Sequence, residues 1–261
     1  MLRPIVNCVL AAVLMAAAGS ARAGMHATPE FEAGTTRPRT IVFLPPQAML
    51  IKRKVIQTEQ QIEESGELAN YLGASVRAAF AAQGYEVRVL RPDEVNADPE
   101  LQELVLDAGR RYSELLAQVR TRLPRQIGKR RYEAGDEMRT LAGKLGVDAI
   151  GFADIQIYAA AAGASAVAIL TGFGAAGSST LLTVSIIDGT TANIEAYFVP
   201  PAMRRGSMAG YDAIMADPAG KIAELARLTL RDLPKADAAA RAPTESDEDV
   251  LSDVEDLLDN Q

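Results

Sequence analysis

The side chains best suited to chemistry in this chain of 261 residues are four aspartates, Asp148, Asp154, Asp188 and Asp212. Carboxylates can act as general acid and base, or they can hold a divalent metal through oxygen. None of the four belongs to an Asp-x-Asp pair, and no phosphate-binding glycine loop accompanies them. Gly172-Phe-Gly174, which leads on to Gly177, lacks the strand-turn-helix context and the acid of a dinucleotide site. A carboxylate-based enzyme is therefore an alternative that we do not favour, and we expect no catalytic, cofactor-binding or metal-ligating residues.

Thiol and imidazole groups are almost absent. The chain contains one cysteine, Cys8, one histidine, His26, and no tryptophan. Nucleophile–base pairs with histidine, the usual zinc sites, disulfide frameworks and haem ligation by histidine need more of these groups. Because both residues precede the first predicted strand, we expect the folded core to lack thiol and imidazole. The sequence therefore favours a function exerted through shape and surface contact.

The N-terminus has the pattern of a removable export signal. Arg3 precedes an apolar stretch, residues 4–19, that is too short to span a bilayer, and Ala21-Arg22-Ala23 closes the segment. We expect cleavage after Ala23, and the alternative is an uncut N-terminal membrane anchor. Cys8 lies in the middle of the apolar stretch instead of at its end, so we do not expect it to carry a lipid. The Ala- and Arg-rich composition is typical of a bacterial protein, which favours the periplasm.

Hydrophobic periodicity predicts a single α/β domain over residues 39–233, preceded by a flexible lead-in, residues 24–38. Strands are predicted at residues 39–44, where Pro45-Pro46 follows, and at 85–90, 147–158, 180–187 and 194–199. Helices are predicted at residues 68–80, 98–123, 138–145 and about 218–232, the second capped by Asp98. Asp188-Gly189 between two apolar runs predicts a hairpin. The order is β-α-β-α-α-β-(insert)-β-β-α, which indicates a mixed sheet in two or three layers with antiparallel late strands.

Four phrases of the sequence carry a family resemblance. They are a strand ending in Leu-Pro (residues 40–45), Gln-Gly-Tyr-Glu-Val (83–87), Gly-Val-Asp-Ala-Ile-Gly (146–151) and Leu-Thr-Val-Ser-Ile-Ile-Asp (182–188). With the element order they resemble a group of envelope proteins. The group includes the periplasmic domain of the curli-secretion channel lipoprotein, the lipoprotein activators of penicillin-binding proteins and the N-terminal domain of the Tol-system β-propeller protein.

The resemblance covers about residues 40–232 and implies a non-catalytic adaptor or assembly subunit that binds other envelope proteins. It implies no site residues, since the phrases encode core and turns. The chain departs from the group in two ways: it lacks a lipid-bearing cysteine, and it carries an Ala/Gly-rich insert between two strands.

That insert, residues 159–179, contains no charged residue. Small residues recur there at every fourth position, namely Ala160, Ala164, Ala168, Gly172 and Ala176, a spacing that lets two helices approach closely. Three interpretations stay open. The insert is a close-packed crossover or buried strand, a surface for self-association or a partner, or a hairpin that enters a membrane and serves a membrane-associated oligomer or secretion-channel accessory.

A basic run lies between two of the predicted helices and consists of Arg120, Arg122, Arg125, Lys129, Arg130 and Arg131. Such a run is either a solvated face or a docking patch for anions, such as phospholipid head groups or an acidic partner. Nucleic acid is not an expected partner, because the chain has a formal net charge of −7 and an export signal.

The C-terminal residues 234–261 are predicted to form a linker followed by an acidic amphipathic tail. From Thr244 onward the tail has eight acidic residues and no basic one. An apolar stripe at helical spacing accompanies them, made of Val250, Leu251, Val254, Leu257 and Leu258. Three roles stay open: a helix that folds onto a partner, a solubilising tail, and a helix docked on its own domain.

Together these patterns predict a non-catalytic periplasmic protein of the bacterial envelope that binds or scaffolds other proteins and needs no cofactor. Other envelope proteins are the expected partners, with a second copy of the chain or an anionic membrane surface as further candidates.

Overall fold

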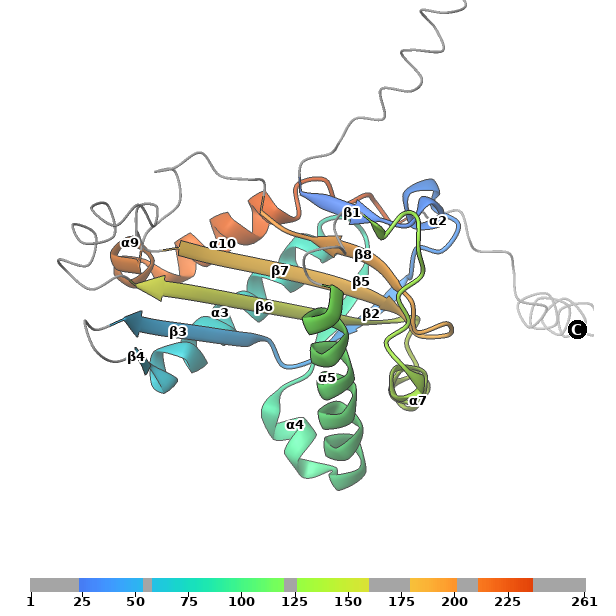
Figure 1. The fold of residues 1–261 in the computed structure, drawn as a ribbon, viewed down its shortest axis with the longest axis horizontal. Coiled ribbons are helices and arrows are strands. Elements are labelled where there is room, and N and C mark those ends of the chain that lie inside the picture. The colour runs from blue at the N-terminus through green and yellow to red at the C-terminus, as the bar shows by residue number, and fades with distance from the viewer. Residues whose placement is uncertain (1–23, 54–57, 120–125, 160–178, 201–210, 237–261) are drawn as a thin grey trace, which may run out of the picture.

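The computed structural model describes residues 24–53, 58–119, 126–159, 179–200 and 211–236. In this part of the chain an eight-stranded mixed sheet lies between two layers of helices (Figure 1). The strands are β1 (Met25–Ala27), β2 (Thr40–Phe43), β3 (Gln47–Arg53), β4 (Thr58–Gln60), β5 (Glu86–Val89), β6 (Ala149–Ala159), β7 (Ser179–Asp188) and β8 (Ile194–Phe198). The helices are α2 (Pro29–Ala33), α3 (Ile62–Ala81), α4 (Pro92–Ala97), α5 (Pro99–Val119), α7 (Asp136–Leu145), α9 (Tyr211–Ala216) and α10 (Pro218–Thr229). The predicted α/β class is confirmed, and the predicted elements follow one another as expected, but β1, α2, β3, β4, α4 and α9 were not predicted.

The strands follow the order β1-β8-β7-β6-β2-β5, and β3 and β4 extend the sheet beyond the end of β2. β2 runs parallel to β5 and β6, whereas β7 is antiparallel to β6 and β8 is antiparallel to β7. The late strands are therefore antiparallel, as predicted. The longest pairing joins β6 to β7, and these two strands lie at the centre of the sheet.

The sheet continues past the proline pair at residues 45–46, which follows the first predicted strand. β2 pairs with the start of β6, and β3 then pairs in parallel with its second half, from Gln47 opposite Asp154 to Lys52 opposite Ala159. Proline has no backbone N–H, so the ladder is interrupted at Pro45 and Pro46 and resumes once donors return. The predicted first strand corresponds to β2 and ends before the prolines, and β3 is a further strand that was not predicted.

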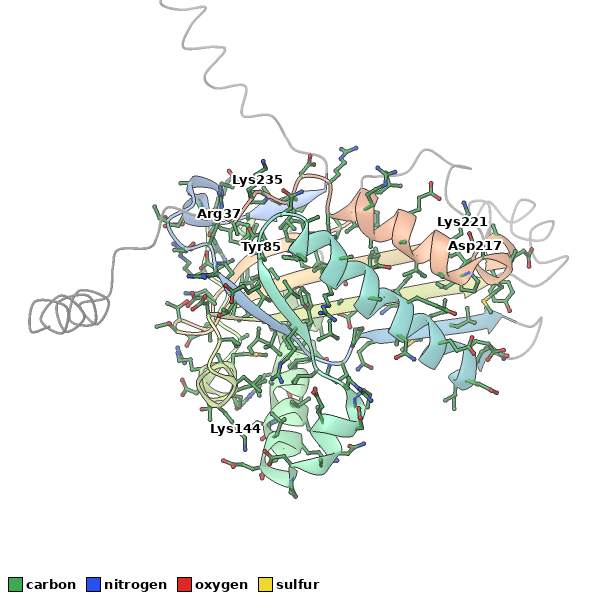
Figure 2. The ribbon with its side chains drawn as sticks, turned by 180° about the vertical axis from the view of Figure 1, so that it is seen from behind. Arg37, Tyr85, Lys144, Asp217, Lys221 and Lys235 are labelled. Carbon is green, nitrogen blue, oxygen red and sulfur yellow. The ribbon has the colours of Figure 1, made fainter. Side chains whose placement is uncertain are left out.

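Each face of the sheet carries its own hydrophobic layer. α3 and α10 pack side by side on one face (Figure 2), where an edge-to-face cluster of Phe43, Phe80 and Phe198 fills the centre. α4, α5 and α7 cover the other face. Gly151 of β6 touches the ring of Phe43 so closely that a Cβ there would lie 2.5 Å from it, which requires glycine at this position.

Local signals account for the main boundaries. Asp98 Oδ1 accepts hydrogen bonds from the backbone N–H groups of Glu100 and Leu101, which makes it the predicted N-terminal cap of α5. Gly146 ends α7 with a left-handed φ of 63°. Asp188 Oδ1 accepts from the backbone N–H groups of Thr190 and Thr191 and so shapes the predicted hairpin between β7 and β8.

Residues 24–38 are part of the fold and not a flexible lead-in. β1 pairs with β8, Thr28 accepts a hydrogen bond from the Phe31 N–H at the start of α2, and the Phe31 side chain is fully buried. A three-residue strand and a five-residue helix are too short to show hydrophobic periodicity, so periodicity alone could not reveal them. His26 lies in β1 opposite Tyr197 and is half-buried, so it belongs to the folded domain, although it is a member of neither hydrophobic core cluster.

The linker prediction fails at its first three residues. The Tyr85 hydroxyl donates to the carbonyl oxygen of Pro234 (3.1 Å), Arg37 Nη1 donates to that of Lys235 (3.1 Å), and the Ala236 N–H donates to that of Gln83 (2.8 Å). Figure 2 shows Arg37, Tyr85 and Lys235 gathered at one end of α3. The described fold therefore extends from Gly24 to Ala236.

Both ends of the predicted insert belong to the central strand pair. β6 ends at Ala159 and β7 begins at Ser179, while Ala160, Ala164, Ala168, Gly172 and Ala176 lie outside the described residues. Among the helices that are described, none combines the length and the apolar character needed to cross a membrane.

Candidate functional site: a cleft between α5 and the sheet

A cleft of about 790 Å³ opens between α5 and the face of the sheet that carries it. One wall is α5, one end is α4, and the floor and opposite rim come from β6 and the β2–β3 junction. This volume is in the range of about 300–1,000 Å³ that is typical of binding pockets.

The α5 wall is mainly apolar because residues one helical turn apart project into the cleft. Val105, Leu106, Gly109, Leu116 and Ala117 line it, and the Leu106 side chain is 66% exposed. The polar residues of the same wall are Gln102, Arg110, Tyr112 and Ser113. On the opposite rim, Met49 of β3 is 39% exposed. Two large apolar side chains thus face water across one cleft, an arrangement that is uncommon away from binding surfaces.

The floor is more polar than the wall. Alternation along β6 places Phe152, Asp154 and Gln156 on the cleft side, and Thr183 of β7 lies beside them. Asp154 and Gln156 are half-buried, and Thr183 is buried. The cleft therefore combines an apolar wall with a floor that offers one carboxylate, one amide and one hydroxyl.

Tyr112 fixes α5 against the sheet at the back of the cleft. Its ring stacks on Phe152 with the centroids 3.9 Å apart, and its hydroxyl lies 2.5 Å from the hydroxyl of Ser185 in β7. Tyr112 and Ser185 are both buried. This contact holds the apolar wall at a set distance from the floor.

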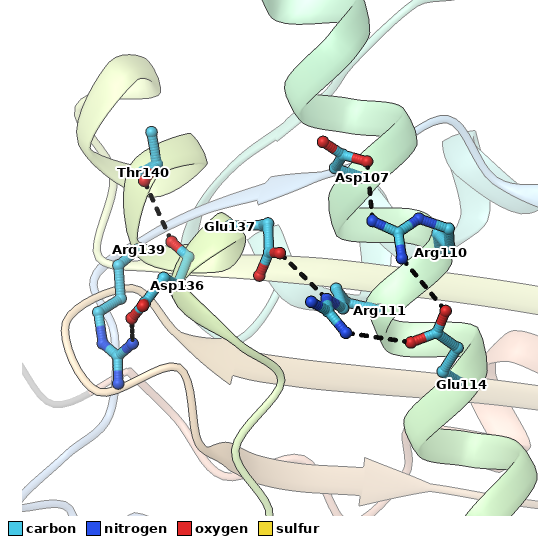
Figure 3. Close-up of polar contacts among 8 residues, drawn as sticks. All are labelled: Asp107, Arg110, Arg111, Glu114, Asp136, Glu137, Arg139 and Thr140. Carbon is cyan, nitrogen blue, oxygen red and sulfur yellow. Dashed lines mark hydrogen bonds and ion pairs between the residues drawn. The ribbon is translucent and has the colours of Figure 1, made fainter.

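Charged side chains of α5 form a network that begins at Arg110, which also lines the cleft (Figure 3). Arg110 bonds to Asp107 (3.1 Å) and to Glu114 (3.2 Å), and Arg111 bonds to Glu137 of α7 (3.0 Å). The hydrogen bonds that the Arg110 guanidinium donates to Asp107 and to Glu114 raise the pKa of Arg110 above its ordinary value. The network joins α5 to α7 and leaves Arg110 shared between two carboxylates.

The four candidate aspartates are not brought together. Asp148 accepts from the backbone N–H groups of Arg39 and Thr40, which ties the start of β6 to β2. Asp188 shapes the hairpin, and Asp212 is exposed in the first turn of α9. Only Asp154 lines the cleft. Within the described ranges, no three His, Cys, Asp or Glu side chains are grouped so that they could hold a metal ion.

The predicted basic patch is divided by the structure. Arg120, Arg122 and Arg125 lie outside the described residues, and Lys129 and Arg130 are exposed. Arg131 instead braces the fold, because Nη2 lies 2.5 Å from Glu30 Oε1 and Nη1 lies 3.9 Å from the buried Glu195. Arg131 is thus engaged in ion pairs within the fold, and the anion-docking patch stays a prediction.

The predicted partner-binding stripe of the tail also lies outside the described residues, and it comprises Val250, Leu251, Val254, Leu257 and Leu258.

The cleft beside α5 was not predicted from the sequence. Its signal was the run Leu104-Val105-Leu106 in α5, since three consecutive apolar residues spread over a wider arc of a helix than one buried stripe needs.

Comparison with known proteins gives no family for this chain. No family model and no curated protein sequence matches it. Among solved structures, PelC from Paraburkholderia phytofirmans, solved as a dodecamer, matches with 9% sequence identity and a TM-score of 0.32, over 79% of this chain and 98% of that one. A likeness at this level carries no argument about fold or function.

Proposed function

We propose that the protein is a non-catalytic binding or scaffolding protein of the bacterial cell envelope, which acts in the periplasm through contacts with other proteins. The observation that carries this proposal is the cleft beside α5, where Leu106 faces water from an apolar wall. Covering a leucine of this kind favours association by roughly 1.5–3 kcal/mol when its burial is complete. The cleft is therefore suited to binding a segment that carries apolar side chains of its own.

Two features of the sequence support the same proposal. The N-terminal pattern is that of an export signal, and the chain has one histidine and one cysteine. The aspartates that could replace them in catalysis have structural tasks at Asp148 and Asp188, where each carboxylate accepts backbone N–H groups. These carboxylates hold turns and strand ends in place.

Site-specific photo-crosslinking in intact cells tests the proposal. A photoreactive amino acid at Leu106 samples the cleft, and the same residue at Ile62, which is 79% exposed and lies outside the cleft, is the matched control. We expect a discrete adduct with an envelope protein from position 106 and none from position 62. An absence of adducts from position 106, with the fold intact by circular dichroism, contradicts the proposal.

Fractionation tests the location. We expect the protein in the periplasmic extract of osmotically shocked cells, with an N-terminus at Gly24. Recovery in the cytosol would contradict an envelope function whatever the cleft binds.

A further inference from the structure

We propose that two copies of the protein associate through the open edge of β5, with the two β5 strands antiparallel and related by a two-fold axis at Val87. The inference goes beyond the proposed function, because no residue of β5 lines the cleft. It is carried by three observations: β5 ends the sheet, its valines are incompletely covered, and the charges on either side of Val87 complement their own two-fold image.

β5 is the last strand at its end of the sheet. Among the described residues it pairs with β2, and no strand lies on its other side. The Glu86 N–H donates to the carbonyl oxygen of Arg39, and the Leu90 N–H donates to β2 in the same way. Because backbone groups alternate in direction along a strand, those of Val87 and Val89 point toward the open edge. Such an edge is a template for a further strand.

The side chains of β5 divide between its two faces. Val87 and Val89 pack against the core layer beneath α3 and remain half-buried. Glu86 and Arg88 lie on the opposite face and are exposed. A strand added at the open edge would extend the apolar layer beside the two valines, so their further burial favours association.

The charges on either side of Val87 select a second copy as the added strand. In an antiparallel pair centred on Val87, Glu86 of each copy lies beside Arg88 of the other, and the two Val87 residues exchange backbone hydrogen bonds. The neighbouring two-fold registers would place Glu86 beside Glu86, or Arg88 beside Arg88. Like charges in directly opposite positions are unfavourable, so the charge pattern favours the register centred on Val87.

Both charged groups are able to make the new contacts. Arg39 donates to one oxygen of Glu86, Oε1, through Nε (3.0 Å) and Nη2 (2.8 Å). Within the described ranges the other oxygen, Oε2, accepts no hydrogen bond, and the exposed Arg88 forms no ion pair. Each copy therefore brings to the edge a guanidinium without a carboxylate partner and a carboxylate oxygen that can accept from it.

The contacts of the chain's C-terminal part limit the length of the pairing. The Ala236 N–H donates to the carbonyl oxygen of Gln83, so residues 234–236 lie next to the chain just before β5. The paired segment is therefore not much longer than β5 itself. A contact of this size buries less area than a permanent dimer needs, and we expect a dissociation constant of about 10–100 μM.

Sedimentation velocity of the purified protein over a range of concentrations tests the inference. We expect a monomer–dimer equilibrium that weakens as salt is raised. Arg88→Glu should weaken the dimer about tenfold or more, because the two-fold axis repeats the new like-charge contact with Glu86. Arg130→Glu is the matched control and should leave the dimer unchanged. It makes the same charge change at an exposed residue of the loop whose Gly128 adjoins β1, at the opposite end of the sheet.

A mixture of two variants tests the register. Glu86→Arg should also weaken the dimer of identical chains. An equimolar mixture of Glu86→Arg and Arg88→Glu should form a heterodimer about tenfold tighter than the dimer of either variant, because an acidic edge then meets a basic one. Thermal midpoints within about 2 °C of the parent protein establish that the variants are folded, since the substituted positions are exposed.

Three outcomes would overturn the inference: a protein that stays monomeric at about 1 mM, a dimer that Arg88→Glu leaves intact, and a mixture that forms no heterodimer. The chain ending at Ala236 should dimerise like the full-length chain. If it dimerises and the full-length chain does not, the chain's own tail occupies the edge, and the inference falls. None of these results bears on the proposed function, which the crosslink from position 106 in cells tests separately.

Discussion

The Thr28 hydroxyl donates a 2.5 Å hydrogen bond to the carboxylate of Glu195, which lies 167 residues further along the chain. Glu195 is almost fully buried, and the Thr36 hydroxyl donates to the same oxygen (2.9 Å). Arg131 Nη1 lies 3.9 Å from the other oxygen. A buried carboxylate needs such partners, because its solvation by water is lost. Through these contacts Glu195 of β8 holds residues 24–38 against the sheet.

Thr28→Val should lower the free energy of unfolding by about 1–3 kcal/mol, because it deprives a buried carboxylate of a donor and α2 of its N-terminal cap while keeping the side-chain shape. Urea denaturation measures the change. Thr35→Val is the matched control, since the Thr35 hydroxyl donates at the surface to the carbonyl oxygen of Glu30. Equal losses for the two variants would show that Glu195 does not depend on Thr28.

Tyr112→Phe should also destabilise the fold by about 1–3 kcal/mol, because the buried Ser185 hydroxyl loses a partner at the back of the cleft. Ser185→Ala in the Tyr112→Phe background should cost less than it does alone, since the partner is already gone. Tyr71→Phe, at an exposed tyrosine of α3, should leave the urea midpoint unchanged. Additive effects of the two buried substitutions would contradict a direct coupling between these hydroxyls.

The framework of the fold could be predicted because its signals are local. Asp98 before Pro99 marks the start of α5, and Asp188-Gly189 marks the hairpin, each through hydrogen bonds to backbone groups two or three residues away. The long strands β6 and β7 show their apolar alternation within their own length. In these elements sequence neighbours alone decide the conformation, so a pattern of residue types is enough to find them.

The missed elements depend on partners that are distant in the chain. β1 has three residues and is a strand because β8 lies beside it, and β3 resumes after Pro46 because β6 offers a continuing edge. The cleft has the same origin, since it forms only where α5 crosses β6. Leu106 and Asp154 are far apart in the sequence, and they line the same cleft only as a result of tertiary packing.

His26 predicts a pH dependence of stability. Burial lowers its pKa below the ordinary value of 6.5. As the pH falls below about 6.5, the unfolded chain takes up a proton that the folded protein does not, so the free energy of unfolding decreases until the folded pKa is passed. The pKa values of Asp98 and Glu137 are also lowered, from 3.8 and 4.5, and they affect a more acidic window.

Urea denaturation between about pH 5 and pH 7.5 measures this effect. His26→Gln should flatten the decrease, because glutamine does not titrate in that window. Parallel stability curves for the parent protein and His26→Gln would show that the imidazole gains its proton equally in both states, and that its burial in β1 has no energetic consequence.

The end of the folded domain gives the last prediction. A chain that stops after Leu233 loses the carbonyl groups of Pro234 and Lys235, which accept from Tyr85 and Arg37, and the Ala236 N–H, which donates to Gln83. Three hydrogen bonds at about 0.5–1.5 kcal/mol each predict a loss of about 1.5–4.5 kcal/mol. A chain that stops after Ala236 keeps all three.

We therefore expect the chain ending at Ala236 to melt within about 2 °C of the full-length protein. The chain ending at Leu233 should melt about 3–18 °C lower, at roughly 2–4 °C per kcal/mol for a domain of this size. Differential scanning calorimetry of the three chains distinguishes the two boundaries. If both truncations melt together at the lower temperature, residues 237–261 contribute to the stability of the domain, and a tail that serves only a partner is ruled out. If both melt with the full-length protein, the contacts of residues 234–236 follow from the docking of Leu233 and do not stabilise it.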